Sequence, residues 1–530
     1  MSSFLFTNGA VLTMKSPGDI HSACAVTGDR ILAVGRYEEI KDRLGPEALE
    51  IDLGGGALLP GFQDCHLHFI LSAYFKFNLD LAGIGALDHL LSVIKERAMS
   101  SPPGRWILGL RFREDDYPEK RMPFLDELDQ AAPDHPVLLV RYDGHSILAN
   151  SRALSAAGLN SEAADPAGGS IGRSGGKLTG LFKEKAMDLI LSAMPYPELD
   201  EFRRGHQAFT RTLLSYGVTG VHNVLMTSDK GPSGALGPFE IPVFKLLEPE
   251  FPFRHYPLVA AATTKECIRV LEESFGARKE DGRWLGGAMK LFADGTFGSR
   301  TAFFYDDYHD APGQRGYLIN PLEWLKETIF EAQAEGLQTC THAIGDRAVG
   351  ELAEIFEQAR ARYGRRDLRH RLEHAGLIRP EDLRRLKAAG VICSLQPTFI
   401  LSEGPWMTDR VGTRLSRVYP LRSLLDGGVP VCGGSDSPIE EPSVTAGLWA
   451  AVARPGFTPD QAISPWEAIS LYTSRAAYAS FEEGRLGVVA PGRLADLTVL
   501  DRNPLAIQVQ ELREIKVKLT MIAGRIVYQA

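Results

Sequence analysis

The stretch Leu58–His68, which reads LLPGFQDCHLH, is an apolar segment that ends in two histidines two positions apart. In an extended strand, side chains two residues apart point to the same side. His66 and His68 therefore face one point, and their separation suits two imidazoles on a single cation. Because a lone His-x-His pair also arises by chance, the weight of this pattern depends on residues further along the chain.

Later apolar segments contain or precede further side chains that bind metals or move protons. They are Lys290 within GAMKLFADG, His342 after LQTCT, His374 after LRHRLE and Asp436 after VPVCGGS. Amphipathic helical patterns separate these segments, over residues 321–335, 346–363 and 380–389. Strands that alternate with helices indicate βα units and a parallel sheet. When such units close into a barrel, the groups that follow the strands meet at one rim.

Both ends of the chain carry short β-rich segments. The first includes the hairpin turn Thr27–Arg30, and the last covers residues 494–528. Neither end has enough strands to fold alone. We therefore expect an α/β protein in which residues 1–59 and 485–530 form one composite β-sandwich domain. A distorted TIM-type (β/α)8 barrel, residues 60–484, is then inserted between the two halves of the sandwich.

The segment of about residues 71–213 follows the first barrel strand and is too long for one βα loop. We expect it to be an insertion with its own structure near the mouth of the barrel. Its apolar run Pro136–Val140 leads into polar residues that include His145. His145 is therefore a candidate for the site, and the alternative is a structural histidine that stabilises the insertion.

Composition excludes several classes of function. The 530 residues carry a formal net charge of −9 and no basic run, which argues against nucleic-acid and anionic membrane partners. The six cysteines contain no Cys-x-x-Cys pair and indicate a reducing compartment. We find neither a secretory leader nor an apolar stretch long enough to span a bilayer. These features predict a cytoplasmic protein.

The order of the motifs PGFQDCHLH, Lys290, His342, His374 and Asp436 resembles the amidohydrolase superfamily of metal-dependent hydrolases. The segments RYDGHSILANSRAL, KLFADGTFGSRTA and HAIGDRAV look like one branch of it. That branch holds the N-substituted formamide deformylases and N-acyl amide hydrolases. The resemblance runs from about Phe4 to Val527, nearly the whole chain.

The resemblance implies a metal centre with one or two divalent ions. His66 and His68 would hold one ion with Asp436, and His342 and His374 the other, with a CO2-derived carbamate on Lys290 as the bridge. Burial lowers the pKa of a lysine and favours the neutral amine that reacts with CO2. The alternatives are a Lys290 that reaches the surface and His370 as a weaker ligand. These ligands suit Zn²⁺ first, with Mn²⁺, Fe²⁺ and Co²⁺ as alternatives.

The expected reaction is hydrolysis of an amide, N-formyl or N-acyl C–N bond in a small molecule. The metal lowers the pKa of water to roughly 7, so hydroxide can attack the carbonyl carbon. Asp436 would move the proton to the leaving amine, unless it only caps a helix. His145 could stabilise the oxyanion. Three residues could position substrate or support the ligands: Asp294, Arg300 and Arg371.

Two other functions remain as alternatives. A deaminase on the same scaffold usually has a glutamate three residues after the histidine at the position of His342, where this chain has Gly345. A non-catalytic regulatory or binding protein would have no need of a complete ligand set and Asp436. Unpaired sandwich edges are compatible with a homodimer.

Overall fold

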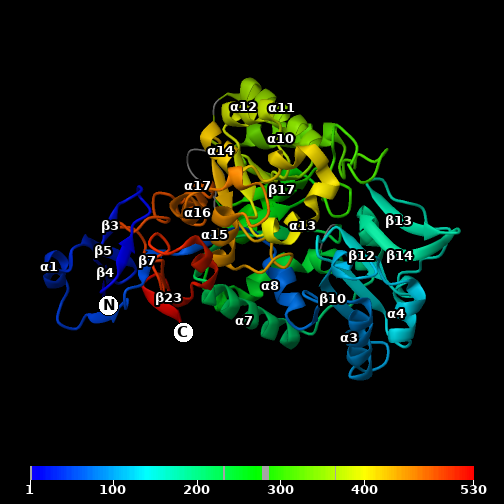
Figure 1. The fold of residues 1–530 in the computed structure, drawn as a ribbon, viewed down its shortest axis with the longest axis horizontal. Coiled ribbons are helices and arrows are strands. Elements are labelled where there is room, and N and C mark those ends of the chain that lie inside the picture. Colours follow the sequence, from blue (N-terminus) through cyan, green and yellow to red (C-terminus); the bar gives the residue numbers. More distant parts are fainter. Residues whose placement is uncertain (1–2, 231–232, 277–285, 365) are drawn as a thin grey trace.

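A parallel β-barrel lies at the centre of the computed structural model, which describes residues 3–230, 233–276, 286–364 and 366–530 (Figure 1). Its eight strands follow the order β21-β20-β19-β18-β17-β16-β15-β8. A parallel bridge between Leu67, at the end of the first strand, and Ser437, which follows the last strand, brings the sheet nearly to closure. The strands are β8 Phe62–Leu67, β15 Val218–Met226, β16 Arg254–Ala260, β17 Ala288–Phe292, β18 Thr339–Ala343, β19 Arg371–His374, β20 Ile392–Leu395 and β21 Val431–Gly433.

Helices cover the outside of the barrel. On α11, the buried positions Val349, Leu352, Ala353 and Phe356 have the spacing of an apolar helical face. Several helices end at a left-handed glycine, such as Gly336, where a Cβ would cost energy. The helices are α8 Gly237–Leu247, α9 Thr264–Phe275, α10 Leu322–Glu335, α11 Asp346–Tyr363, α12 Pro380–Ala389, α13 Phe399–Val411, α14 Leu421–Gly427, α15 Val444–Ala453, α16 Pro465–Leu471 and α17 Ser474–Ala479. The predicted α/β barrel is confirmed.

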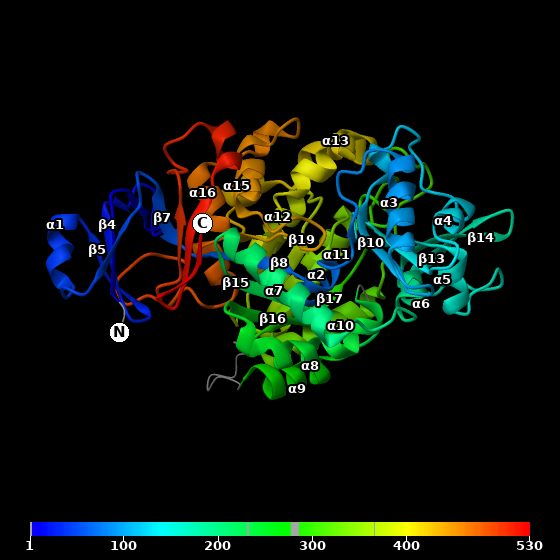
Figure 2. The same ribbon diagram turned by 90° about the horizontal axis from the view of Figure 1, so that it is seen from below.

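Strands from both ends of the chain share one sheet. β22 pairs antiparallel with β7, so the N-terminal and C-terminal segments lie side by side in Figure 2. The first sheet contains β5 Arg30–Gly35, β4 Ala23–Thr27, β1 Ser3–Thr7 and β6 Leu49–Asp52. The second contains β24 Arg525–Gln529, β23 Val517–Ile522, β22 Leu497–Leu500, β7 Ala57–Pro60, β2 Ala10–Leu12 and β3 Ile20–His21. The exact boundaries between the sandwich and the barrel stay predictions.

The chain between β8 and β15 forms a further sheet at the opposite end of the molecule from the terminal strands (Figure 2). Its strands, in spatial order, are β13 Gly169–Ser174, β14 Lys177–Glu184, β12 Ser146–Ala149, β11 Val137–Arg141, β10 Ile107–Phe112 and β9 Leu79–Asp80. The helices of this segment are α2 Phe69–Phe75, α3 Leu87–Met99, α4 Leu125–Ala131, α5 Ser151–Ala156, α6 Asp188–Leu191 and α7 Leu199–Ser215. A separate cluster of buried side chains includes Leu90, Phe112, Leu128 and Leu139.

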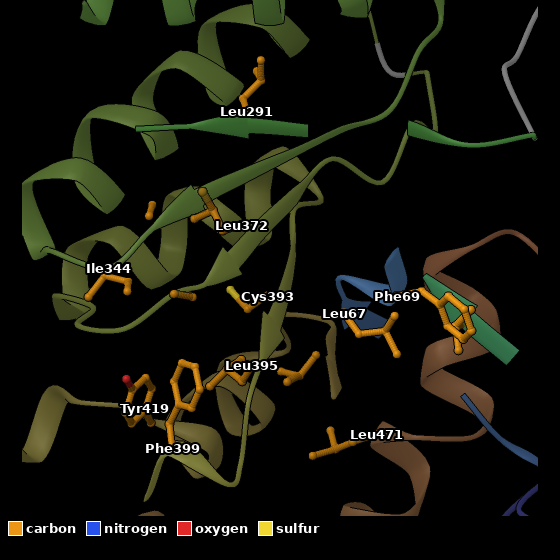
Figure 3. Packing of buried hydrophobic residues seen from close by; sticks show 14 of the residues in the cluster. Leu67, Phe69, Leu291, Ile344, Leu372, Cys393, Leu395, Phe399, Tyr419 and Leu471 are labelled. Carbon is orange, nitrogen blue, oxygen red and sulfur yellow. The ribbon is translucent and has the colours of Figure 1, made fainter. Parts of the chain in front are cut away.

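The alternation of side chains along the barrel strands separates the apolar layer from the polar interior. Leu291 of β17, Leu372 of β19 and Leu395 of β20 pack in the main apolar cluster (Figure 3). Their neighbours Lys290 and Arg371 are buried polar residues on the other side of these strands. None of the helices described in the structure is long and apolar enough to cross a membrane.

Candidate metal centre and active site

The structure brings the predicted metal ligands together in one cavity at the barrel rim. We call this space of about 60 Å³ the metal-site cavity. Residues that lie more than 360 positions apart in the chain meet there because parallel strands end at the same rim. Its lining includes all the predicted ligands, which are His66, His68, Lys290, His342, His374 and Asp436.

His66, His68 and Asp436 each offer one metal-ligating atom, and these atoms lie within 4.8 Å of one another. Nε2 of His66 lies 3.5 Å, and Nε2 of His68 3.3 Å, from Oδ1 of Asp436. Barrel closure holds this geometry, since the N–H of Asp436 donates to the carbonyl of His66 at 2.6 Å and the N–H of His68 donates to the carbonyl of Ser437 at 2.7 Å. Two imidazoles and a carboxylate suit a divalent cation. These side chains therefore fit a metal ion.

Electrostatics keeps Asp436 ionised. Burial alone would raise the pKa of its carboxyl group, but His66, His68 and His374 surround it and hold the pKa below its ordinary value. A carboxylate in this state is both a metal ligand and a proton acceptor.

His342 and His374 lie on adjacent strands with ring centroids 4.5 Å apart. Nδ1 of His374 bonds to Oε1 of Gln396 at 2.7 Å, which leaves Nε2 for a ligand. Nε2 of His342 lies 3.2 Å from the carbonyl of Gly295, which leaves Nδ1. Burial lowers the pKa of both rings, that of His374 to about 3, so the imidazoles are neutral and able to bind a metal.

Lys290 projects into the metal-site cavity from β17 and is 2% exposed. Its Nζ lies 4.7 Å from the centroid of the Phe292 ring. Burial lowers the pKa of the amine, although the nearby carboxylates Glu373 and Asp436 oppose the shift. The burial does not support a lysine that reaches the surface.

Glu373 supports His66 from the interior of the barrel, a role that sequence reasoning missed. Oε2 of Glu373 lies 2.5 Å from Nδ1 of His66, and Oε1 accepts a hydrogen bond from Nε of Arg371 at 2.8 Å. Glu373 and Arg371 are two residues apart on β19, so both point inward. A carboxylate on the far nitrogen of a ligand histidine fixes its tautomer and orientation. The sequence did hold a signal for this role, because Arg371 and Glu373 point inward from a strand that ends in the predicted ligand His374.

His145 lies between β11 and β12 and lines the metal-site cavity. Its Nδ1 is 2.7 Å from Oε2 of Glu184, at the end of β14. Burial opposes a charge on the ring, but Glu184 raises the pKa of His145 to about 9. The His145 and His342 ring centroids are 5.0 Å apart. His145 can therefore present a protonated nitrogen to the cavity at neutral pH.

Known proteins resemble this chain over nearly its whole length. Residues 49–528 match the model of the Amidohydrolase family. The chain belongs to the amidohydrolase family. YtcJ of Bacillus subtilis (strain 168), named as an amidohydrolase, is 33% identical over 99% of both chains. The N-substituted formamide deformylase of Arthrobacter pascens is 30% identical over 100% of this chain and 99% of the relative. An uncharacterised metal-dependent hydrolase from Pyrococcus horikoshii OT3 superposes with a TM-score of 0.72 at 26% identity, over 96% and 99% of the two chains.

Three residues predicted to contact substrate or support ligands in this amidohydrolase have protein partners and do not line the described part of the metal-site cavity. Arg371 lies in the barrel interior and bonds to Glu373. The buried carboxylate of Asp294 accepts backbone N–H groups of Phe303, Ile344 and Gly345. Arg300 pairs with Asp310 at 2.8 Å. Arg371 thus reaches the predicted ligand His66 through Glu373. That any of the three residues contacts substrate stays a prediction.

His370, the weaker ligand candidate of this amidohydrolase, lies away from the metal-site cavity at the other end of β19. Its Nε2 is 2.9 Å from Oε1 of Gln333, and Nδ1 accepts the N–H of Thr339 at 3.0 Å. Both ring nitrogens therefore have protein partners. The strand rises about 3.3 Å per residue, which separates His370 from His374 by roughly 13 Å.

Proposed function

We propose that this amidohydrolase hydrolyses the C–N bond of an N-acyl or N-formyl amide in a small molecule. The observation that carries the proposal is the position of the ionised Asp436 within 3.5 Å of the paired histidines His66 and His68. Hydrolysis of an amide needs a group that moves a proton to the leaving nitrogen, because an amide anion is too basic to leave. The name of the formamide deformylase relative supports a bond of this type.

The residues that would hold the metal are His66, His68 and Asp436 on one side and His342 and His374 on the other. We propose Zn²⁺ as the ion and a carbamate on Lys290 as a further anionic ligand. A bound divalent cation supplies two effects, a lower pKa of water and polarisation of the substrate carbonyl.

The side chains of the protein supply the remaining steps. Asp436 accepts the proton of the attacking water and passes it to the leaving nitrogen as the C–N bond breaks. His145, held by Glu184, donates a hydrogen bond to the substrate oxygen that becomes negative. One amide and one water thus give one carboxylic acid and one amine.

Metal analysis of the purified protein, combined with a screen of N-formyl and N-acyl amides, tests this function. We expect bound metal and formation of amine and acid in equal amounts. Release of ammonia from amino-substituted heterocycles, with no amide cleaved, would instead support the deaminase. Protein that binds no metal and cleaves no amide would support a regulatory or binding role.

A further inference from the structure

A second, larger space adjoins the metal-site cavity. We call this space of about 520 Å³ the apolar chamber. It shares His145, Lys290 and Phe292 with the metal-site cavity, so a single molecule can extend from one space into the other. The apolar chamber lies over the carboxyl ends of β15, β16 and β17, at the rim where barrel enzymes bind substrate.

The walls of the apolar chamber are mainly aromatic, thioether and alkyl groups. The residues that matter for the argument are Met187, Met226, Ala261, Phe292, Ile319 and Trp324. Two of its polar side chains already have protein partners. Nζ of Lys185 donates to Oδ1 of Asn320 at 2.8 Å, and Nδ2 of Asn320 donates to the carbonyl of Phe292 at 2.9 Å. The chamber thus offers mainly apolar and aromatic contacts, although the charged side chains of Lys185, Asp188 and Lys230 also lie in its lining.

The two spaces differ greatly in size. The metal-site cavity has about 60 Å³ of room, whereas the apolar chamber, at about 520 Å³, falls within the range of sites for whole small molecules. A substrate with two small substituents would leave the chamber filled with water against apolar walls. Transfer of an apolar group into the chamber is favourable because it removes apolar surface from water.

We propose that the apolar chamber receives a bulky aromatic or branched apolar substituent of the scissile amide. This inference rests on the proposed amide hydrolysis and adds the substrate class. Trp324 and Phe292 provide ring faces and edges for an aromatic group, and the Met187 and Met226 side chains adapt to its outline. Phe292 lines both spaces. A ring bound against it would therefore lie next to the metal-site cavity, where the scissile carbonyl would sit beside Lys290.

Filling the chamber tests the inference. Ala261 follows β16 and is only partly buried, so Ala261→Trp adds bulk to the chamber wall without entering the main core. The control is Ala164→Trp, at an exposed position of the segment between β8 and β15. The probes are N-methylformamide against N-(naphthylmethyl)formamide, and N-methylacetamide against N-methyl-naphthylacetamide. The two pairs distinguish a bulky amine from a bulky acyl group.

We expect the wild type to prefer the bulky member of at least one pair. Ala261→Trp should lower kcat/KM for that substrate by about 10²-fold and leave the small one within about 3-fold. Ala164→Trp should behave as the wild type. The inference would be overturned if the wild type cleaved the small and the bulky member of each pair with equal kcat/KM. It would also be overturned if Ala261→Trp lost the same factor in kcat/KM for the small and the bulky substrate.

Calorimetric titration with naphthylmethylamine and naphthylacetate separates this inference from the proposed function. If no amide is cleaved, the proposed function fails, but the chamber still predicts that one ligand binds the metal-loaded wild type. Binding should weaken about 10²-fold or more in Ala261→Trp. Equal binding to the wild type and Ala261→Trp would show that the chamber does not hold the bulky group.

Discussion

Nδ1 of His66 lies 2.5 Å from Oε2 of Glu373, in a contact that crosses the barrel interior from β8 to β19. The carboxylate is fixed from its other side by Arg371, whose Nε donates to Oε1 at 2.8 Å. The hydrogen bond leaves Nε2 of His66 free to face Asp436. The orientation of the first ligand thus depends on two residues that do not line the metal-site cavity in the described structure.

Glu373→Gln should weaken metal binding because the His66 ring loses its charged partner. The expected loss of affinity is about 10–100-fold, measured by competition with a chelator. Arg371 would also lose its buried counter-ion, so a lower melting temperature should accompany the change.

Gln396→Met provides the matched variant, because it removes the partner of His374 without leaving a buried charge. We expect a similar loss of metal affinity with a smaller effect on stability. Unchanged affinity in both variants would mean that these partners do not orient the ligands.

Lys290→Ala should lose metal and reduce kcat by at least about 10²-fold, because the variant cannot form the proposed carbamate ligand. Short carboxylic acids added to the buffer should restore part of the metal content and part of kcat. Metal content and kcat at several acetate and propionate concentrations provide the measurement. Lys177→Ala, in an exposed hairpin, is the control and should match the wild type. Full activity of Lys290→Ala without added acid would contradict a carbamate.

Asp436→Asn should keep most of its metal and lose roughly 10²–10⁴ in kcat, since the amide side chain cannot accept the proton. Elemental analysis and steady-state kinetics on the same sample separate the two effects. Substrates with more acidic leaving amines should lose less. A rate equal to that of the wild type would remove Asp436 from the proton transfer.

Glu184→Gln should lower kcat by about 10–10²-fold with metal content unchanged, because Glu184 positions and charges His145 and is not one of the predicted metal ligands. Glu184 raises the pKa of His145 to about 9, against the effect of burial. Without this carboxylate the pKa falls, so the high-pH limb of the kcat profile should move to lower pH. Glu162→Gln, at an exposed position, should leave the profile in place. A profile that does not move would show that His145 acts without its charge.

The titration of Glu240 should make the free energy of unfolding depend on pH. Burial raises the pKa of this carboxyl group, which accepts the N–H of Met226 at 2.6 Å, to about 7. The folded state then keeps the proton that the unfolded state loses near pH 4.5, so this contribution to stability falls as pH rises from about 4.5 to 7. Glu240→Gln mimics the protonated group and should remove that slope.

Unfolding free energies of the wild type and Glu240→Gln should be similar at pH 4 and diverge above it. By pH 8 the variant should be more stable by up to about 3 kcal/mol, which corresponds to the rise of the Glu240 pKa from 4.5 to about 7. The difference between the two proteins isolates Glu240 from other titrating groups. A difference that stays constant with pH would show an ordinary pKa for Glu240.

Strand and helix periodicity made much of the site predictable. The alternation in LLPGFQDCHLH placed His66 and His68 on one side, and the βα pattern placed Lys290, His342, His374 and Asp436 after strands. These are local properties, because a side chain's direction in a strand follows from its position in the strand. Asp294 shows the limit, since the sequence does not reveal that its carboxylate is already bonded to three backbone N–H groups.

The sequence by itself determined the α/β barrel and the set of side chains predicted to meet at its rim. Only the tertiary structure decided the partners: Glu373 on His66, Gln396 on His374, Glu184 on His145, and the apolar chamber beside Lys290. The physical reason is that a repeat of two or 3.6 residues specifies which way each side chain points. Contacts between elements instead depend on strand register, barrel closure and the path of long connections, which no local pattern encodes.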